Sequence, residues 1–550
     1  MIYKVSKTAK GQKELLFIIC SLLFSVALTS CSDEWNDHYE EATTAGGTLW
    51  QTIKDNSSLE NFASVLEACG YNTVLDGSQT FTVFAPTNTA LSTSETNELI
   101  ASFRSQQEAG VRTSENTVIR RFIMNHIAQY RYPVSSLTNQ TITLMNDKYA
   151  KLTSMQLGRN SLTEKNTLCD NGLLFTMDSK LDYVPNVLET LDMEEGLDSV
   201  YSFLSSHNTY EFVEAQSVPG EIIDGMTHYM DSVTVLTNDL LSKYGRIDLE
   251  DSTYWFIAST NTVWDELVEE YTPYFNYPRN VLKRDSMQYT NTRLAIIGGG
   301  FFSRTVNSDV AFRDSAVSTQ ALTNEQRRLL GITDNYYVYQ HPFDEGGVFY
   351  GTTEIACSNG QVRKASSATI SKYLTFMQDI SVEAENISSQ DTLINAIDPL
   401  TIVQVASNNK FYGKVSGDSY VEVNPVNPSA RVAVGFKIPD LLSGVKYNIY
   451  AVFAPATAGD SLAIAETEKP LRVLSRIRQP DQNGVISSPP FRYAKSVDGT
   501  TVNEVLLQSI VSLTTCSWGL ATPTVRLELQ SNTDGATLRI DRIIFRCAKE

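Results

Sequence analysis

The sequence is poor in the residues that carry metal or nucleophilic chemistry. It has only five histidines among 550 residues, and its seven cysteines include no C-x-x-C pair. The patterns H-E-x-x-H of zinc proteases and G-x-S-x-G of many hydrolases are also absent. These absences argue against structural zinc and against the common hydrolases. We therefore expect a protein that is not an enzyme and that uses neither a metal nor a cofactor.

Disulfides and positive charge are scarce as well. Five widely spaced cysteines follow residue 31, and an odd number does not form a disulfide framework. Cys516 and Cys547 share the C-terminal segment, so they either pair or remain buried free thiols. With 63 acidic and 44 basic residues the net charge is −19, which disfavours nucleic acid as a partner, although solubility alone would also explain the acidity.

The one long apolar run is Leu15–Leu28, which four lysines precede. It is too short to span a membrane as a helix and has the form of a signal peptide. Leu28–Cys31 resembles a bacterial lipobox, which implies lipidation of Cys31; a plain secretory signal with an incidental cysteine is the alternative. The acidic start Ser32–Asp37 resembles the surface-export signal of some Gram-negative lipoproteins. We expect a lipoprotein signal peptide at residues 1–30, an acidic tether at 31–44, and a lipid anchor in the outer membrane with the protein facing the cell exterior.

A strand–turn–helix pattern occurs twice. Phe81–Leu91 (FTVFAPTNTAL) aligns with Tyr254–Trp264 (YWFIASTNTVW), and the later stretch Cys169–Gly172 aligns with Cys357–Gly360. In each copy of the first stretch, an apolar run predicts a buried strand, and the following asparagine predicts an N-cap for the next helix. We therefore predict one fold present twice, at residues 45–190 and 195–380.

The first copy resembles a fasciclin domain, an α+β fold associated with adhesion. The resemblance rests on TVFAPTN at Thr82–Asn88, a helix that ends in Asn125-His126, and an Asn-Gly turn that leads into a strand at Asn171–Asp178. It implies that His126, with Tyr130 and Tyr132 nearby, is the candidate ligand-binding region. A core histidine satisfied by hydrogen bonds is the alternative.

The second copy departs from the fasciclin pattern. Ser259 stands where the first copy has Pro86, and Phe301 stands near the position of His126. The ligand-binding role that the resemblance implies for the histidine is therefore not expected in the second copy. After Gly298–Gly300, the third glycine of a G-x-G-x-x-G dinucleotide loop would fall at Ser303, so we interpret this stretch as a helix end or a turn.

Beyond Asp391 the apolar period changes to two, with turn residues between short runs. This pattern predicts an antiparallel β-sandwich at residues 385–550. Its last strand, Leu538–Phe545 (LRIDRIIF), weakly resembles that of jelly-roll carbohydrate-binding modules. Trp518 lies outside the strand pattern and is the candidate exposed platform for a sugar ring. The strands are expected at Thr401–Val405, Arg431–Lys437, Tyr447–Phe453, Leu471–Ile477, Thr524–Gln530 and Thr537–Phe545.

Together these features predict a multidomain protein with two α+β fasciclin-like domains, the second divergent, followed by an all-β antiparallel sandwich. We expect a non-catalytic surface lipoprotein that mediates adhesion or binds an extracellular glycan or protein. By analogy it would be accessory to an outer-membrane polysaccharide-uptake complex, so its expected partners are the membrane through the lipid, the ligand, and a transporter complex. A structural or matrix adhesion protein without glycan binding is the alternative, and a polysaccharide-active enzyme is a weaker one.

Overall fold

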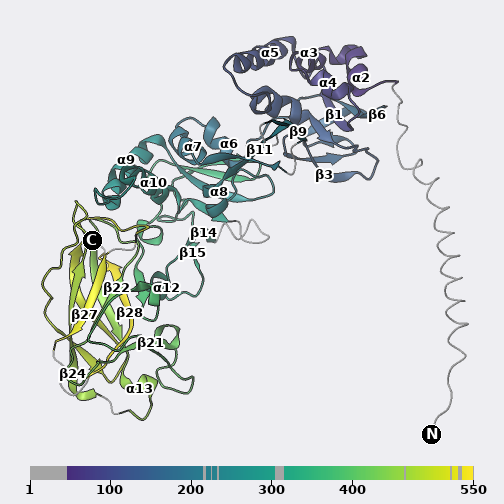
Figure 1. The fold of residues 1–550 in the computed structure, drawn as a ribbon. Coiled ribbons are helices and arrows are strands. Elements are labelled where there is room, and N and C mark those ends of the chain that lie inside the picture. The colour runs from purple at the N-terminus through teal and green to yellow at the C-terminus, as the bar shows by residue number, and fades with distance from the viewer. Residues whose placement is uncertain are drawn as a thin grey trace, which may run out of the picture. The chain divides into compact units, whose positions relative to one another are not determined.

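The computed structural model describes residues 46–214, 218–223, 226–231, 234–303, 315–463, 466–520, 523–530 and 536–548. The chain divides into two compact units, Met1–Pro185 and Asn186–Glu550 (Figure 1). The expected signal peptide, the acidic tether and Cys31 lie outside the described residues. Within the described ranges, no helix is both long enough and apolar enough to cross a membrane.

The first unit contains a seven-stranded sheet with the order β2-β1-β7-β6-β5-β4-β3. β1 is internal: it pairs antiparallel with β2 and parallel with β7, and all its residues are buried. A strand covered on both faces requires such a continuous apolar run. The strands are β1 Phe81–Pro86, β2 Ile127–Gln129, β3 Asn139–Thr143, β4 Tyr149–Thr153, β5 Gln156–Leu157, β6 Asn160–Cys169 and β7 Gly172–Met177.

Two apolar clusters lie on opposite faces of β1. Phe81, Val83 and Ala85 pack into a cluster with the helices, and Phe84 stacks on Phe175 of β7 at 5.2 Å in the other. The alternation of β1 side chains therefore joins the helical layer to the rest of the sheet. The helices are α2 Leu49–Asp55, η1 Ser57–Leu59, α3 Glu60–Ala68, α4 Tyr71–Asp76, α5 Thr93–Glu108, η2 Thr113–Glu115, η3 Ile119–Ile123 and η4 Met124–His126.

The second unit begins with a sheet that repeats this arrangement. Its order is β15-β14-β13-β12-β17-β16, and β12 pairs antiparallel with β13 and parallel with β17, as β1 does with β2 and β7. The predicted duplication of the fold is confirmed. The strands are β12 Tyr254–Ser259, β13 Phe301–Ser303, β14 Ser315–Ala321, β15 Tyr336–Gln340, β16 Thr353–Cys357 and β17 Gly360–Ala365.

The Asn-Gly pairs found in the sequence perform the same structural task in both copies. The side-chain oxygen of Asn171 accepts a hydrogen bond from the first amide of α2, at Leu49, at 2.8 Å. Asn359 does the same for Val187 at 2.9 Å. Each asparagine also donates to two backbone carbonyls of a distant segment. These bonds satisfy orphan groups at a helix start and fix the loop beneath it.

Asn88 and Asn261 do act as helix N-caps, as predicted, but they cap different helices from the ones expected. The side-chain oxygen of Asn88 accepts from the amide of Asn61 in α3, at 3.0 Å, rather than from the helix that follows it. In the second copy Asn261 accepts from Ser199 at 3.1 Å. Each asparagine thus caps a helix from earlier in the chain, α3 in the first copy and α7 in the second. The helix after β1 begins only at Thr93, after the turn that follows Asn88.

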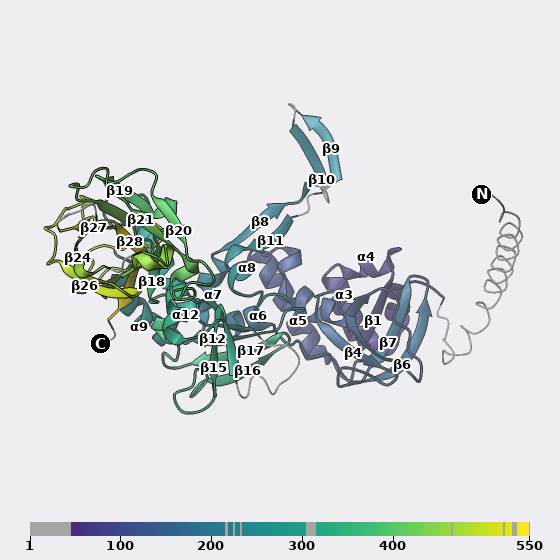
Figure 2. The same cartoon turned by 90° about the horizontal axis from the view of Figure 1, so that it is seen from below.

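Additional segments distinguish the second copy. Two antiparallel ribbons, β8 with β11 and β9 with β10, project from its helices (Figure 2). The ribbons are β8 Asn208–Phe212, β9 Val218–Ile223, β10 Met226–Asp231 and β11 Thr234–Asn238. The helices are α6 Val187–Met193, α7 Asp198–Ser205, α8 Asp239–Tyr244, α9 Asn261–Tyr271, η6 Thr272–Phe275, α10 Arg284–Ile297, α12 Asn324–Leu330 and η7 Lys372–Leu374.

The C-terminal part is the predicted antiparallel β-sandwich. One sheet has the order β20-β21-β28-β23-β26 with β18 also on β28, and the other has the order β19-β22-β27-β24-β25. The strands are β18 Ile380–Glu383, β19 Gln390–Ile394, β20 Thr401–Gln404, β21 Ser419–Val423, β22 Ala433–Lys437, β23 Lys446–Phe453, β24 Glu466–Arg478, β25 Lys495–Gly499, β26 Asn503–Ser512, β27 Thr524–Leu529 and β28 Leu538–Cys547. Short helices are η8 Ile387–Ser389, η9 Ser416–Asp418 and α13 Ala456–Gly459.

The second fasciclin-like domain and the sandwich share one apolar core. Tyr271 and Phe275 from the α9–η6 segment lie in the same buried cluster as Val434, Ile449 and other residues of both sheets. The sequence does not reveal this common core, because the helices and strands of each domain are predicted separately and would be sufficient for a domain of its own. Cys516 and Cys547 are both buried in this core as free thiols, so they do not pair.

Candidate binding sites

His126 is part of the core of the first unit. It is fully buried at the end of η4, where its Nδ1 lies 2.8 Å from the carbonyl oxygen of Phe122. The amide of Leu181 donates to Nε2 at 3.0 Å, so Nδ1 carries the proton and donates to Phe122. Burial lowers the pKa of His126 to about 4. With both nitrogens occupied and no exposed surface, His126 cannot contact a ligand, which corrects its assignment as a binding residue and supports the core alternative.

Tyr130 and Tyr132 are placed differently from His126. Thr82 of β1 orders both, because its hydroxyl donates to the carbonyl of Tyr130 at 2.8 Å and accepts from the amide of Tyr132 at 2.9 Å. The Tyr130 side chain is 68% exposed, whereas Tyr132 packs partly against the apolar cluster of Phe84. Tyr130 is therefore accessible to a partner, and the binding role of both tyrosines stays a prediction.

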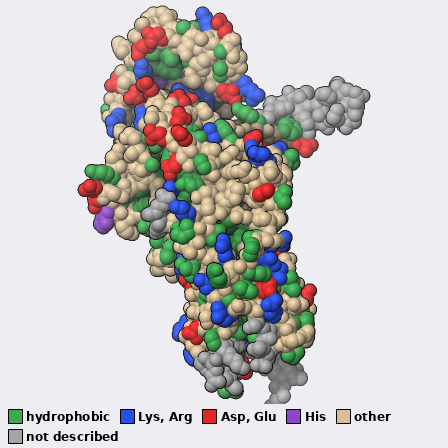
Figure 3. Space-filling model, turned by 90° about the vertical axis from the view of Figure 1, so that its left-hand side faces the viewer, with side chains coloured by type: hydrophobic (Ala, Val, Ile, Leu, Met, Phe, Trp, Pro, Cys, Tyr) green, Lys and Arg blue, Asp and Glu red, His purple; other side chains and the backbone are tan. Residues whose placement is uncertain are grey.

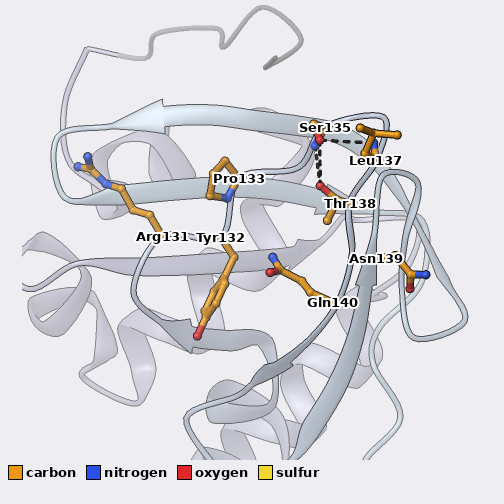
Figure 4. Close-up of a pocket in the computed structure, with 8 residues that line it drawn as sticks. All are labelled: Arg131, Tyr132, Pro133, Ser135, Leu137, Thr138, Asn139 and Gln140. Atoms are coloured by element: carbon orange, nitrogen blue, oxygen red, sulfur yellow. Dashed lines mark hydrogen bonds between the residues drawn. The ribbon is translucent and has the colours of Figure 1, made fainter. Parts of the chain in front are cut away.

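A shallow pocket of about 450 Å³ opens beside Tyr132. Figure 4 shows that all of its lining side chains come from one continuous segment, between β2 and the start of β3. Within it, the amide of Ser135 donates to the hydroxyl of Thr138 at 2.7 Å and closes the turn. The pocket presents hydroxyl and amide groups and the exposed Leu137. Its lining residues are Arg131, Tyr132, Pro133, Ser135, Leu137, Thr138, Asn139 and Gln140.

Trp518 is not the exposed platform that the sequence predicts. It lies on a turn inserted between the sandwich and the second fasciclin-like domain, where the amide of Cys516 donates to the carbonyl of Asn276 at 2.8 Å. The Trp518 ring meets Phe275 edge-on at 6.0 Å, and its carbonyl accepts from the Tyr277 hydroxyl at 3.0 Å. Trp518 is partly buried against the shared core and is not among the exposed residues. Any ligand contact by Trp518 stays a prediction.

A larger groove, which the sequence analysis did not find, lies in the sandwich. It has a volume of about 520 Å³ and runs between residues 487–495 and the edge strand β26. Tyr493 stands at its rim with 93% of its surface exposed. The lining residues are Arg476, Ile477, Gln479, Ser487, Pro489, Pro490, Arg492, Tyr493, Lys495 and Leu506–Ser512.

Specific contacts hold the two walls of this groove in place. The amide of Arg492 donates to the carbonyl of Ser475 at 2.9 Å, so residues 487–495 continue alongside β24 beyond the end of its pairing with β25. The Phe491 ring lies 4.0 Å from the Arg476 guanidinium and fixes the segment from the side. On the opposite wall, an extra residue in β26 places Ile510 at φ 53°, where its amide bonds to the Asn448 side chain. A β-branched residue in this region is strained, and bulges often border binding sites.

The groove is positively charged although the chain is acidic. Arg476, Arg492 and Lys495 line it, and no aspartate or glutamate does. Burial lowers the pKa of Arg476, and the nearby charges of Arg526 and Arg478 lower it further. The run PPFRYAK at Pro489–Lys495 is the sequence signal that could have indicated this site, because it alternates aromatic and basic residues after two prolines.

The other chemical patterns have structural explanations. Gly298–Gly300 ends α10 and leads into β13, and a side chain at Gly299 would collide with Thr375. This agrees with the helix-end interpretation. In the part of the chain that the structure describes, no group of three or more His, Cys, Asp or Glu is arranged to hold a metal ion.

Comparison with known proteins identifies the first domain. Residues 57–183 match the family model described as Fasciclin domain. No curated protein matches the chain. The FAS1 domain pair from the insect cell adhesion molecule fasciclin I is similar at 10% identity and a TM-score of 0.20, over 59% of this chain and 96% of that one.

Solved structures similar to the sandwich include carbohydrate-binding modules. The CBM22-1 xylan-binding domain from Paenibacillus barcinonensis has 15% identity and a TM-score of 0.20, over 31% of this chain and 94% of that one. A family 35 carbohydrate binding module from Clostridium thermocellum has 12% identity and a TM-score of 0.19, over 30% and 98%. These likenesses are too distant to carry a functional argument. Residues 57–183 of this chain form a fasciclin domain, which a divergent second copy of the fold and a β-sandwich follow.

Proposed function

We propose that this protein is a non-catalytic binding protein of the cell surface and that its sandwich groove holds an extracellular glycan. The observation that carries the proposal is the groove itself, with the exposed Tyr493 at its rim and side chains of Gln479, Gln508 and Arg492 along its walls. Sugars bind proteins through C–H faces stacked on aromatic rings and through hydroxyls bonded to planar polar groups. The groove offers both kinds of contact in one place.

Tyr493→Ala tests this proposal in the full-length protein. Because the ring is almost fully exposed, its removal should leave the fold intact and cost about 1 kcal/mol of binding, which is about a fivefold loss of affinity. Affinity electrophoresis through gels that contain a panel of polysaccharides measures the loss. Tyr412→Ala is the matched control, because Tyr412 is 51% exposed and lies outside the groove lining. Equal retention of both variants, or no retention of the wild type, would contradict glycan capture by this groove.

Attachment to the outer membrane is part of the proposal. Its support is the lipobox-like Leu28–Cys31 and the acidic start that follows it. Cys31→Ala should abolish labelling by a radioactive fatty acid and release the protein from the membrane fraction. Protease treatment of intact cells should cleave the wild-type chain. Protection of the whole chain would place the protein on the periplasmic side. Association with an outer-membrane polysaccharide-uptake complex is the setting we propose by analogy, and co-purification of a transporter after crosslinking tests it.

Adhesion through the first domain is the second candidate. The exposed Tyr130 and the neighbouring pocket of Arg131–Gln140 favour it, because they form an accessible surface of mixed polarity on a rigid sheet edge. If no polysaccharide retains the protein while Tyr130→Ala weakens cell or matrix attachment, the protein acts as a structural adhesin. Hydrolysis of any polysaccharide by the purified protein would overturn the non-catalytic assignment.

A further inference from the structure

We propose that the sandwich groove selects an acidic polysaccharide, whose carboxylate or sulfate groups pair with Arg476, Arg492 and Lys495. The inference rests on the proposed function and narrows it from extracellular glycans in general to anionic ones. It starts from the lining of the groove, which contains these three cations and no carboxylate.

The cations of the groove differ from several other arginines of the sandwich, which pair with carboxylates. Arg539 pairs with Glu422 at 3.0 Å, and Arg546 pairs with Glu504 at 2.6 Å. Within the described ranges, no ion pair involves Arg476, Arg492 or Lys495. Although the chain has an excess of acidic residues, none of these three cations forms an ion pair within the described ranges, and the charge of Glu528 acts on Arg476 without pairing with it. Cations in this state are expected of a site whose counterion is the ligand.

A second row of positive charge lies next to the groove on the same strand. Arg476 stands directly opposite Arg526 of β27, and Arg478 follows two residues later on the same face of β24. Like charges placed opposite each other destabilise a sheet, and Glu528 is the carboxylate that pairs with Arg526 here. The Nε atoms of all three arginines are buried without a hydrogen-bond partner. An anion at this position would offset the repulsion.

The spacing of the cations indicates a repeating ligand. Residues two apart on a strand are about 6.6 Å apart, so Arg478, which lies outside the groove lining, extends the row of positive charge from Arg476 along β24. Lys and Arg side chains lie among hydrophobic ones and some Asp and Glu over the lower part of Figure 3, which is the sandwich. Phe491 already contacts Arg476 and Arg526 with its ring, whereas the Tyr493 ring is free to stack on a sugar.

The net charge of the protein favours a single glycan strand over wider anionic surfaces. A nucleic-acid duplex or an anionic bilayer would also meet the acidic remainder of the chain, and repulsion within about 10 Å would oppose binding. A polysaccharide strand can lie in the groove and contact the basic residues alone.

Affinity electrophoresis of the full-length protein tests the inference with polygalacturonate, chondroitin sulfate and neutral pullulan. The test variant is Arg492→Gln/Lys495→Gln. Lys410→Gln/Lys414→Gln is the control, because these exposed lysines lie outside the groove and their loss changes the net charge equally. We expect the acidic polysaccharides to retain the wild type and the control, and the test variant to bind at least about tenfold more weakly at low salt. Pullulan should retain none of them strongly.

The other outcomes separate this inference from the proposed function. In one outcome pullulan retains the protein, Tyr493→Ala abolishes this retention, and Arg492→Gln/Lys495→Gln leaves it intact. That outcome would overturn the selectivity for acidic polysaccharides, while glycan capture would stand. No retention by any polysaccharide would overturn both. Equal binding of phosphatidylglycerol vesicles or of double-stranded DNA through the same two residues would overturn the assignment to a polysaccharide.

Discussion

His126 has no water-exposed surface, and both of its ring nitrogens are hydrogen-bonded to the backbone. The protonation of His126 is therefore set by the buried environment that surrounds its ring. Burial lowers its pKa to about 4, below the ordinary value of 6.5 in the unfolded chain. Between these values the unfolded chain binds more protons than the folded one, so stability is complete above pH 6.5 and falls as the pH drops toward 4.

We predict that acid destabilises the first unit by up to about 3 kcal/mol over this range through His126 alone. His126→Gln should flatten the pH dependence, whatever it costs in absolute stability. Hydrogen exchange of peptides that cover residues 119–129, measured from pH 7 to pH 4.5, reports the opening free energy. The same substitution at the exposed His341 is the control. An unchanged slope in His126→Gln would refute the assignment of the titrating group.

Asp541 gives the stability of the second unit the opposite dependence on pH. Burial raises the pKa of its carboxyl to about 7, and the neighbouring charges of Glu383 and Glu385 add to this although Arg542 opposes it. A raised folded pKa contributes stability below pH 4 that is lost as the pH rises through 7.

We predict that Asp541→Asn makes the stability of the second unit less dependent on pH between 5 and 8. Asparagine keeps an oxygen that can accept from the Ser416 amide, as Asp541 does at 3.1 Å, and it adds no charge beside Glu383 and Glu385. Urea unfolding in a chelating buffer, so that bound cations do not contribute, measures the effect. A steeper dependence in the variant would contradict the direction of the shift.

At the scale of elements, the parallel pair β1–β7 depends on a glycine. A side chain at Gly172 would place its Cβ 2.1 Å from the carbonyl oxygen of Phe81, and one at Gly360 in the second copy would lie 1.8 Å from the carbonyl oxygen of Tyr254. The glycine of each Asn-Gly turn is therefore required by the close approach of two strands, in addition to the turn.

We predict that Gly172→Ala costs more than about 4 kcal/mol and leaves the first unit largely unfolded, because backbone rather than a flexible side chain occupies the space. Gly158→Ala is the matched control. Gly158 has a φ of +61° with open space around it, so alanine there should cost only about 1 kcal/mol of backbone strain. Urea unfolding followed by hydrogen exchange in peptides from residues 46–185 distinguishes the two. Similar stabilities of the two variants would contradict the packing argument.

The sequence predicts those helices and strands whose apolar residues recur with a regular period, and it does not predict the others. The signature strands β1 and β12 and the strand β28 are apolar enough to be recognised alone. Strands such as β19 (QDTLI) and β25 (KSVDG) were not predicted, because edge strands carry polar residues and glycine. The groove was missed for a related reason. It forms where the irregular segment 487–495 lies beside β24, and that contact follows from tertiary packing.

At the scale of the whole molecule, the second unit is held together by a core that crosses a domain boundary. Phe275 meets Trp518 of the sandwich at 6.0 Å, and the Ser443 amide of the sandwich donates to the carbonyl of Tyr274 at 3.0 Å. Cutting the chain near residue 380 would expose these surfaces. Fully exposing each large apolar side chain costs about 2 kcal/mol.

We predict that residues 186–550 fold cooperatively, whereas residues 186–380 and 385–550 expressed separately do not. The isolated pieces should bind the dye ANS and lack a sharp calorimetric transition. Cooperative unfolding of both pieces with no dye binding would show that the shared core is not essential to either.

The central claim is that the groove between residues 487–495 and β26 is the ligand site of this protein. Hydrogen exchange of the full-length protein with and without polygalacturonate tests it most directly. We predict slower exchange in peptides that cover residues 487–495 and 506–512, with no change in residues 131–140. Protection confined to residues 131–140, or protection nowhere in the chain, would contradict the account.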